Sequence, residues 1–208
     1  MVLHLHIPDG YLDPIIALVA YLMMILYGIF VLRRGEALNE EKITEMTVIA
    51  AGIFVAQMLN WPIPGGTSLH FVGGALAAIL YGLKGAFIIM FLVLLVQAVV
   101  FHDGGITTLG ANVLNMGIIA PVVGYYIYKL ITTKTNIENK EFIGAFLGGW
   151  FSITLAGIAC GIELGLSTQF LYGLSVSVPV MAIGHFLLGI VEGIITALVI
   201  KYLRKEGE

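Results

Sequence analysis

Long apolar segments dominate this chain of 208 residues and restrict what it can fold into. A helix that crosses a bilayer needs roughly 20 mainly apolar residues. Seven segments are candidates, of which the third is short and glycine-rich: residues 11–32, 43–59, 69–82, 85–101, 109–130, 142–164 and 176–203. They leave no room for a soluble domain of useful size. We therefore predict an all-α membrane protein, a bundle of about seven transmembrane helices.

The composition agrees with this class and excludes several others. Hydrophobic residues make up 59% of the chain and charged residues 11%, whereas soluble domains carry about 25% charged residues. A net charge of −3 gives no indication of a nucleic-acid partner, and one cysteine excludes a disulfide scaffold or a multi-cysteine metal site. The sequence predicts a single polytopic membrane domain over residues 1–208.

The basic residues predict an orientation, because all ten fall on alternate loops of the seven-helix arrangement. They are Arg33, Arg34, Lys42, Lys84, Lys129, Lys134, Lys140, Lys201, Arg204 and Lys205. Loops rich in Lys and Arg stay in the cytoplasm. We therefore expect the N-terminus outside and the C-terminus inside, in the cell (inner) membrane of a prokaryote.

With this orientation, most histidines gather on the outer face, where no Lys or Arg is expected. The four outer histidines are His4, His6, His70 and His102, and the outer carboxylates are Asp9, Asp13, Asp103 and Glu163. Neutral imidazole suits nickel, copper, zinc and cobalt ions. A lone histidine in a loop is usually only a solvated side chain. The prediction of a metal site therefore depends on the grouping of several histidines on one face.

His70 is the least ordinary of these histidines. It follows residues 61–68, a stretch with two prolines and two glycines that is too rigid and polar to face lipid. We predict a re-entrant or capping loop that presents Ser68 and His70 at the start of a helix. By contrast, the stretch from His102 to Gly105 is compatible with an ordinary turn.

The segment Leu5-His6-Ile7-Pro8-Asp9-Gly10 resembles the opening Met-His-Ile-Pro-Asp-Gly of the NikM/CbiM family. Residues 65–80 and the Gly-Ala-Asn…Asn-Met stretch within 97–117 are also similar to that family, so the resemblance covers essentially the whole chain. Its members are the substrate-binding membrane subunits of energy-coupling-factor nickel and cobalt transporters. The resemblance implies that residues 1–10 capture the metal and that residues 11–208 form the helix bundle.

The resemblance also implies a ligand set. In the family an N-terminal amine, the backbone nitrogen and imidazole of the next histidine, and a histidine of a later outer loop bind one metal. Four nitrogens in a plane suit Ni(II), whereas Zn(II) prefers a tetrahedral site. By position the two histidines are His6 and His70. Candidate residues around the ligands are Asp9, Ser68, His102, Asp103 and Asn112.

This sequence departs from the family pattern because five residues precede His6. Three interpretations stay open. The native chain could start at Leu5, read as methionine, which restores the family pattern and is the interpretation we favour. Alternatively, loss of Met1 could free the Val2 amine for a site with the His4 imidazole, or the extension could disable the site. His4 and the amine of Met1 therefore remain candidate ligands.

A separate source of energy is expected, because the chain has no Gly-x-x-x-x-Gly-Lys-Ser/Thr phosphate loop. We therefore expect no enzyme activity and no bound ATP, with nickel or cobalt as the transported substrate. The resemblance implies a membrane coupling (T) subunit, cytoplasmic ATPase subunits and often a small accessory membrane protein. The alternative is a self-sufficient secondary permease that uses His185 and Glu192, which lie on one face of the last segment. A plainer interpretation is that these two polar groups tie the last helix to its neighbours.

Overall fold

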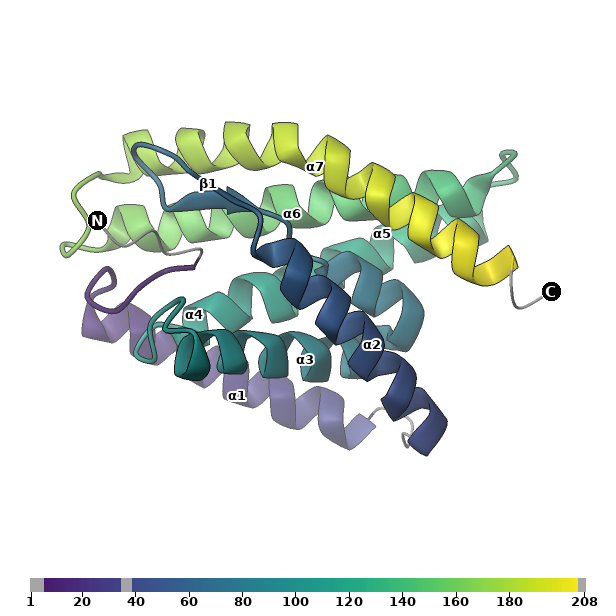
Figure 1. The fold of residues 1–208 in the computed structure, drawn as a ribbon. Helices are drawn as coiled ribbons and strands as arrows, with labels where there is room; N and C mark the ends of the chain where they lie inside the picture. The colour runs from purple at the N-terminus through teal and green to yellow at the C-terminus, as the bar shows by residue number, and fades with distance from the viewer. Residues whose placement is uncertain (1–5, 35–38, 206–208) are drawn as a thin grey trace.

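The computed structural model describes residues 6–34 and 39–205 (Figure 1), so the predicted ligands His4 and Met1 lie outside the described residues. Helices form nearly all of its regular structure. They are α1 (Pro14–Arg34), α2 (Glu40–Gln57), α3 (Gly74–Val100), α4 (Leu109–Val113), the π-helix η1 (Leu114–Ile119), α5 (Ala120–Lys134), α6 (Lys140–Leu166) and α7 (Leu174–Lys205). A short antiparallel hairpin of β1 (Asn60–Pro62) and β2 (Ser68–His70) connects α2 to α3.

Small residues let the helices pack closely, as is typical of membrane bundles. A Cβ added at Gly148 of α6 would lie 2.9 Å from the carbonyl oxygen of Gly124 in α5. A Cβ at Gly149 would lie 2.9 Å from the Cα of Gly193, so α7 approaches α6 equally closely. Many glycines of this chain are therefore packing positions, and α6 and α7 lie side by side along most of their length (Figure 1).

The predicted number of spanning helices is not confirmed. Within residues 6–34 and 39–205, five helices are long and apolar enough to cross a membrane: α1, α3, the continuous run Leu109–Lys134, α6 and α7. The 18-residue helix α2 has four charged residues among its first six, namely Glu40, Glu41, Lys42 and Glu45. The structure is thus that of an all-α, multi-pass membrane protein with five candidate spans.

The predicted span 69–82 is wrong as a full crossing. Its first residues belong to β2, and the helix that follows is interrupted at Gly82, where φ is 67° and ψ is −179°. The eight residues 74–81 rise about 12 Å, far less than the roughly 30 Å hydrocarbon core. The apolar run is therefore a strand, a turn and a half-length helix.

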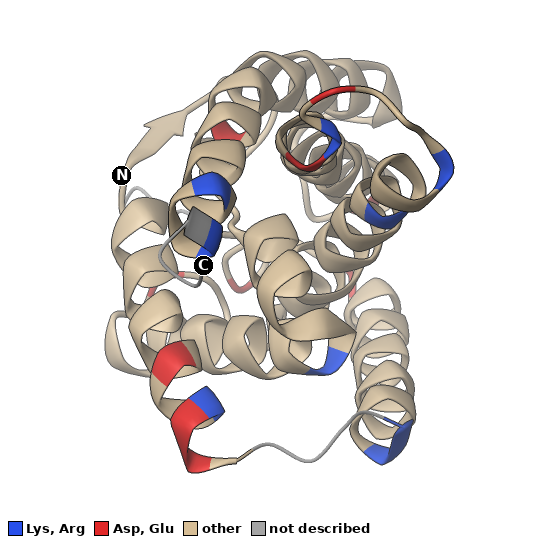
Figure 2. Cartoon of the chain, turned by 90° about the vertical axis from the view of Figure 1, so that its right-hand side faces the viewer, with Lys and Arg blue, Asp and Glu red and all other residues tan. Residues whose placement is uncertain are grey.

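The basic residues gather at one end of the bundle. Figure 2 looks at this end and shows Lys and Arg on helix ends and on the turns between them. These basic residues come from both ends of the described chain, including Arg34 in the last turn of α1 and Arg204 near the end of α7. This arrangement agrees with basic loops on one side of a membrane. Which side faces the cytoplasm stays a prediction.

Candidate metal centre

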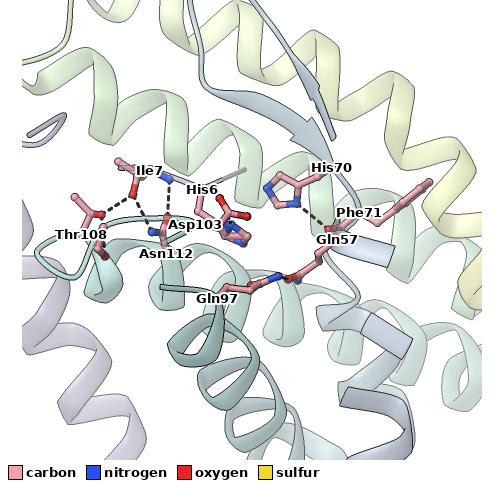
Figure 3. A network of polar contacts seen from close by, with 10 residues as sticks. His6, Ile7, Gln57, His70, Phe71, Gln97, Asp103, Thr108 and Asn112 are labelled. Carbon is pink, nitrogen blue, oxygen red and sulfur yellow. Dashed lines mark hydrogen bonds and ion pairs between the residues drawn. The ribbon is translucent and has the colours of Figure 1, made fainter. Parts of the chain in front are cut away.

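His6 and His70 meet inside the molecule. Their ring centroids lie 4.8 Å apart with the planes tilted by 32°. Only 3% of His6 and 6% of His70 is exposed. Figure 3 shows the two rings pointing toward one another from the N-terminal segment and from the end of β2. The fold therefore brings together the two histidines that the family resemblance selected.

The β-hairpin fixes the orientation of His70. Asn60 pairs with His70 across the hairpin, and the Nδ1 atom of His70 lies 2.8 Å from the carbonyl oxygen of Phe71. A carbonyl oxygen only accepts, so Nδ1 carries the proton and Nε2 keeps a lone pair. Burial lowers the pKa of His70, although the bond to Phe71 opposes the shift. The ring is therefore a neutral imidazole that can bind a metal through Nε2.

His6 is positioned through the backbone of the next residue, Ile7. The Oδ1 atom of Asn112 accepts from Ile7 N, and its Nδ2 atom donates to Ile7 O, both at 3.1 Å. The hydroxyl of Thr108 also donates to Ile7 O, at 2.5 Å, and Gly105 N donates to it at 3.0 Å. These contacts hold the N-terminal segment against the first turn of α4.

Two glycines allow the loop before α4 to reach the N-terminal segment. Gly104 has a φ of +84°, and a Cβ there would lie 3.0 Å from the Cβ of His6. A Cβ at Gly105 would overlap the backbone nitrogen of Asp9. A side chain at either position would push the segment away, so the Gly-Gly pair serves this close approach.

The other residues expected around the ligands differ in their placement. Asp103 Oδ1 lies 3.9 Å from His6 Nδ1, and Ser68 is buried beside the histidine pair. Asp9 instead accepts from the backbone and the hydroxyl of Thr107, at 2.7 and 2.5 Å, and so fastens the segment to the loop. His102 is exposed, with a φ of 54°, and is not among the residues that line the cavity described below.

A small cavity of about 30 Å³ lies beside the histidine pair. His6, His70 and His185 line it together with Cys160, Met116 and Met181. A volume of about 10–15 Å³ already holds one water molecule, so an ion has room here. Across residues 6–34 and 39–205, no three His, Cys, Asp or Glu side chains form a metal-binding group. A complete ligand set would therefore also need backbone nitrogens or the residues before His6.

Buried polar side chains hold the turn after His70, and of these sequence reasoning named Glu192 but missed Gln57 and Gln97. The carboxylate of Glu192 accepts from Val72 N at 2.8 Å and from Gly73 N at 2.9 Å. Gln57 Nε2 donates to Val72 O at 2.8 Å, and Gln97 Nε2 donates to Gln57 Oε1 at 3.0 Å (Figure 3). Glu192 of α7 and Gln57 of α2 thus bond to Val72, and Gln97 of α3 supports Gln57. Polar residues within otherwise apolar helices are the sequence feature that could have indicated these contacts.

His185 and Glu192 have separate surroundings. Glu192 binds the turn after β2, whereas His185 Nδ1 lies 2.8 Å from Met181 O on its own helix. A Cβ at Gly157 would overlap the His185 ring, so α6 packs directly on it. Glu192 therefore ties α7 to a neighbouring element, as the plainer sequence interpretation held.

Comparison with known proteins gives the family. The model of the CbiM family, the cobalt uptake substrate-specific transmembrane region, matches residues 6–207. This chain belongs to the CbiM family. The description of this family, together with the names of the nickel and cobalt transport proteins among the relatives, makes it a membrane component of cobalt and nickel transport and not an enzyme, with these ions as its transported substrates.

Individual relatives agree with this assignment. The chain is 52% identical over 203 residues to a protein of Archaeoglobus fulgidus named "Putative fused nickel transport protein NikMN", covering 96% of this chain and 65% of that protein. It therefore spans about two thirds of that relative. A "Putative metal transport protein" of Haloquadratum walsbyi is 42% identical, with 96% and 89% of the two chains covered. A crystal structure titled as a truncated transition metal transporter superposes with a TM-score of 0.90 at 38% identity, covering 97% and 99%.

Proposed function

We propose that this CbiM-family chain captures Ni(II) or Co(II) at the outer face of a prokaryotic cell membrane and presents it for ATP-driven uptake. The observation that carries the proposal is the buried pair His6 and His70, whose rings face one small cavity. Lys and Arg gather at the end of the bundle that Figure 2 faces, and the described N-terminal segment lies at the other end in Figure 1, so the histidine end attracts a divalent ion with little competing positive charge.

We propose a planar site of four nitrogens. His70 contributes Nε2, and His6 contributes its imidazole and backbone nitrogen. The fourth nitrogen is the amine of a chain that starts at residue 5. In the alternative, loss of Met1 frees the Val2 amine, which forms a different four-nitrogen site with the backbone nitrogens of Leu3 and His4 and the His4 imidazole. The burial of both rings and the fixed tautomer of His70 support this set, because a planar site needs ligands held in place before the ion arrives.

The energy source in this proposal lies in other subunits. A membrane coupling (T) subunit, cytoplasmic ATPases and a small accessory protein follow from the family resemblance and from the lack of a phosphate loop in the sequence. Both carboxylate oxygens of Glu192 accept hydrogen bonds from backbone N–H groups. This favours a coupled subunit over a secondary permease that would need Glu192 to carry protons.

Metal titration of the purified chain tests the proposal. The form that begins at residue 5 as methionine and the form that keeps residues 1–4 are each titrated with Ni(II), Co(II) and Zn(II). His70→Ala is expected to weaken the binding of one nickel per chain strongly, because one of its ligands is lost, whereas the control His102→Ala leaves it unchanged. Equal loss in both variants, or full binding by His70→Ala, would contradict the site. Nickel uptake by proteoliposomes without ATPase subunits would overturn the coupled mechanism.

A further inference from the structure

A second and larger cavity lies at the basic end of the bundle. Its volume is about 450 Å³. The end of α1, the start of α2, the break at Gly82 in α3 and the middle of α5 surround it. Four cationic side chains from these separate segments line it: Arg34, Lys42, Lys84 and Lys129. The fold therefore concentrates positive charge in a concave site, beyond the general gathering of basic residues at this end (Figure 2).

Neighbouring aromatic rings hold two of these cations. The Arg34 guanidinium lies 4.6 Å from the centre of the Phe30 ring, and the Lys129 ammonium lies 5.7 Å from that of Tyr125. Such contacts stabilise a cation over a ring face. No carboxylate lines the cavity in the described parts of the chain, although Glu45 is near enough to Tyr81 to act on it electrostatically. The site keeps an excess of positive charge that an anion can neutralise.

The remaining wall of the cavity is amphipathic. Three tyrosines add hydroxyl groups, while Phe30, Val31 and Leu83 add apolar surface. Apolar side chains continue on the outer faces of the same helices, where 66% of Leu26 and 60% of Leu130 is exposed. A ligand with an anionic head and apolar chains therefore matches the cavity and its surroundings better than an anion alone.

We propose that this cavity binds the phosphate headgroup of an anionic phospholipid. The lysines and the arginine contact the phosphate oxygens, the tyrosine hydroxyls donate to them, and the acyl chains lie along α1 and α5. Basic pockets between membrane helices bind anionic headgroups in this way. The bound lipid would join α1, α2, the break in α3 and α5 at the end of the bundle away from the histidines.

Lipid titration of the full chain in nanodiscs tests the proposal. The probe is phosphatidylglycerol, increased stepwise in phosphatidylcholine, with bound lipid counted by native mass spectrometry. The double variant Lys42→Gln with Lys129→Gln removes two cations from the cavity. The matched control, Lys134→Gln with Lys201→Gln, removes two cations at the same end outside its lining. Each cation near an anionic lipid accounts for about a fivefold change in affinity, so the double variant should lose roughly 30-fold and the control little.

The possible outcomes separate the candidate ligands. Selective loss in the cavity variant, with one or a few phosphatidylglycerol molecules retained by the wild type, supports the site. Equal loss in both variants would show a diffuse surface effect and overturn it. Equal affinity for phosphatidylcholine would also overturn it, as would complete displacement of the lipid by millimolar inorganic phosphate, which would assign the cavity to a free anion. The single variants Lys42→Gln and Lys129→Gln, each expected to lose about fivefold, decide the question if the double variant does not fold.

Discussion

The side-chain amide of Asn112 forms two hydrogen bonds with the backbone of Ile7, accepting from its N–H and donating to its carbonyl oxygen, at 3.1 Å each. Asn112 is only 3% exposed and belongs to α4, so this pair of bonds joins the N-terminal segment to the helix bundle. Its consequence is the position of His6, the residue immediately before Ile7. A second joint, from Glu192 to the backbone of Val72 and Gly73, holds the turn that follows His70.

Replacing Asn112 by Ala should weaken nickel binding without unfolding the chain. Both bonds to Ile7 are lost, so His6 is less well placed opposite His70. Loss of a residue that orients a metal ligand typically lowers metal affinity by 10–100-fold. We therefore expect Asn112→Ala to lower nickel affinity by about tenfold or more. Equilibrium dialysis with Ni(II) measures it, and Asn136→Ala, an exposed change in the turn before α6, is the control. Unchanged affinity in Asn112→Ala would show that the joint does not position His6.

Glu192→Gln should destabilise the turn that follows His70. An amide keeps the shape of the side chain but offers one acceptor oxygen, so one of the N–H groups of Val72 and Gly73 loses its partner. A buried donor left without a partner costs about 1–3 kcal/mol. Thermal unfolding should occur at lower temperature and nickel affinity should fall. An unaltered unfolding temperature, with transport lost, would instead point to proton transfer by Glu192.

Gly105→Ala should displace the N-terminal segment, because the new methyl group overlaps the backbone nitrogen of Asp9. The segment would be cut faster by a protease and nickel would bind more weakly. Gly52→Ala is the matched control, since a Cβ at Gly52 meets nothing within 4 Å. Normal protease resistance in Gly105→Ala would contradict the close approach of the loop.

The stability of the folded chain should decrease at acid pH in part because of His70. Its pKa lies below the usual 6.5 in the folded chain because burial disfavours the charged ring. The unfolded chain therefore binds more protons below pH 6.5, so this stabilisation is complete above pH 6.5 and is lost as the pH falls toward the folded pKa. Unfolding temperatures from pH 8 to pH 5 should fall less steeply for His70→Gln than for the wild type. Parallel curves would show that His70 is not buried in its neutral form.

The sequence could predict the class of protein and the key histidines, and the reasons are physical. Apolar length forces an all-α membrane protein, and the motif around His6 together with His70 indicated the pair that the fold brings to 4.8 Å between ring centroids. The number of spans could not be predicted, because apolar length does not show that the residues from His70 to Gly73 form the end of a strand and a turn, which leaves only residues 74–81 as helix before the break at Gly82. The sequence indicated that Glu192 ties the last helix to a neighbour, but its partners could not be predicted, because they are backbone N–H groups that leave no trace in the side-chain pattern.

We propose that His6 and His70 bind one nickel through nitrogen. X-ray absorption at the nickel edge tests it most directly, using the chain that starts at residue 5 as methionine. We predict four nitrogen ligands in a plane, with imidazole scattering that is reduced by half in His70→Ala. Sulfur scattering from Cys160 or Met181, or an imidazole signal that His70→Ala leaves unchanged, would contradict the account.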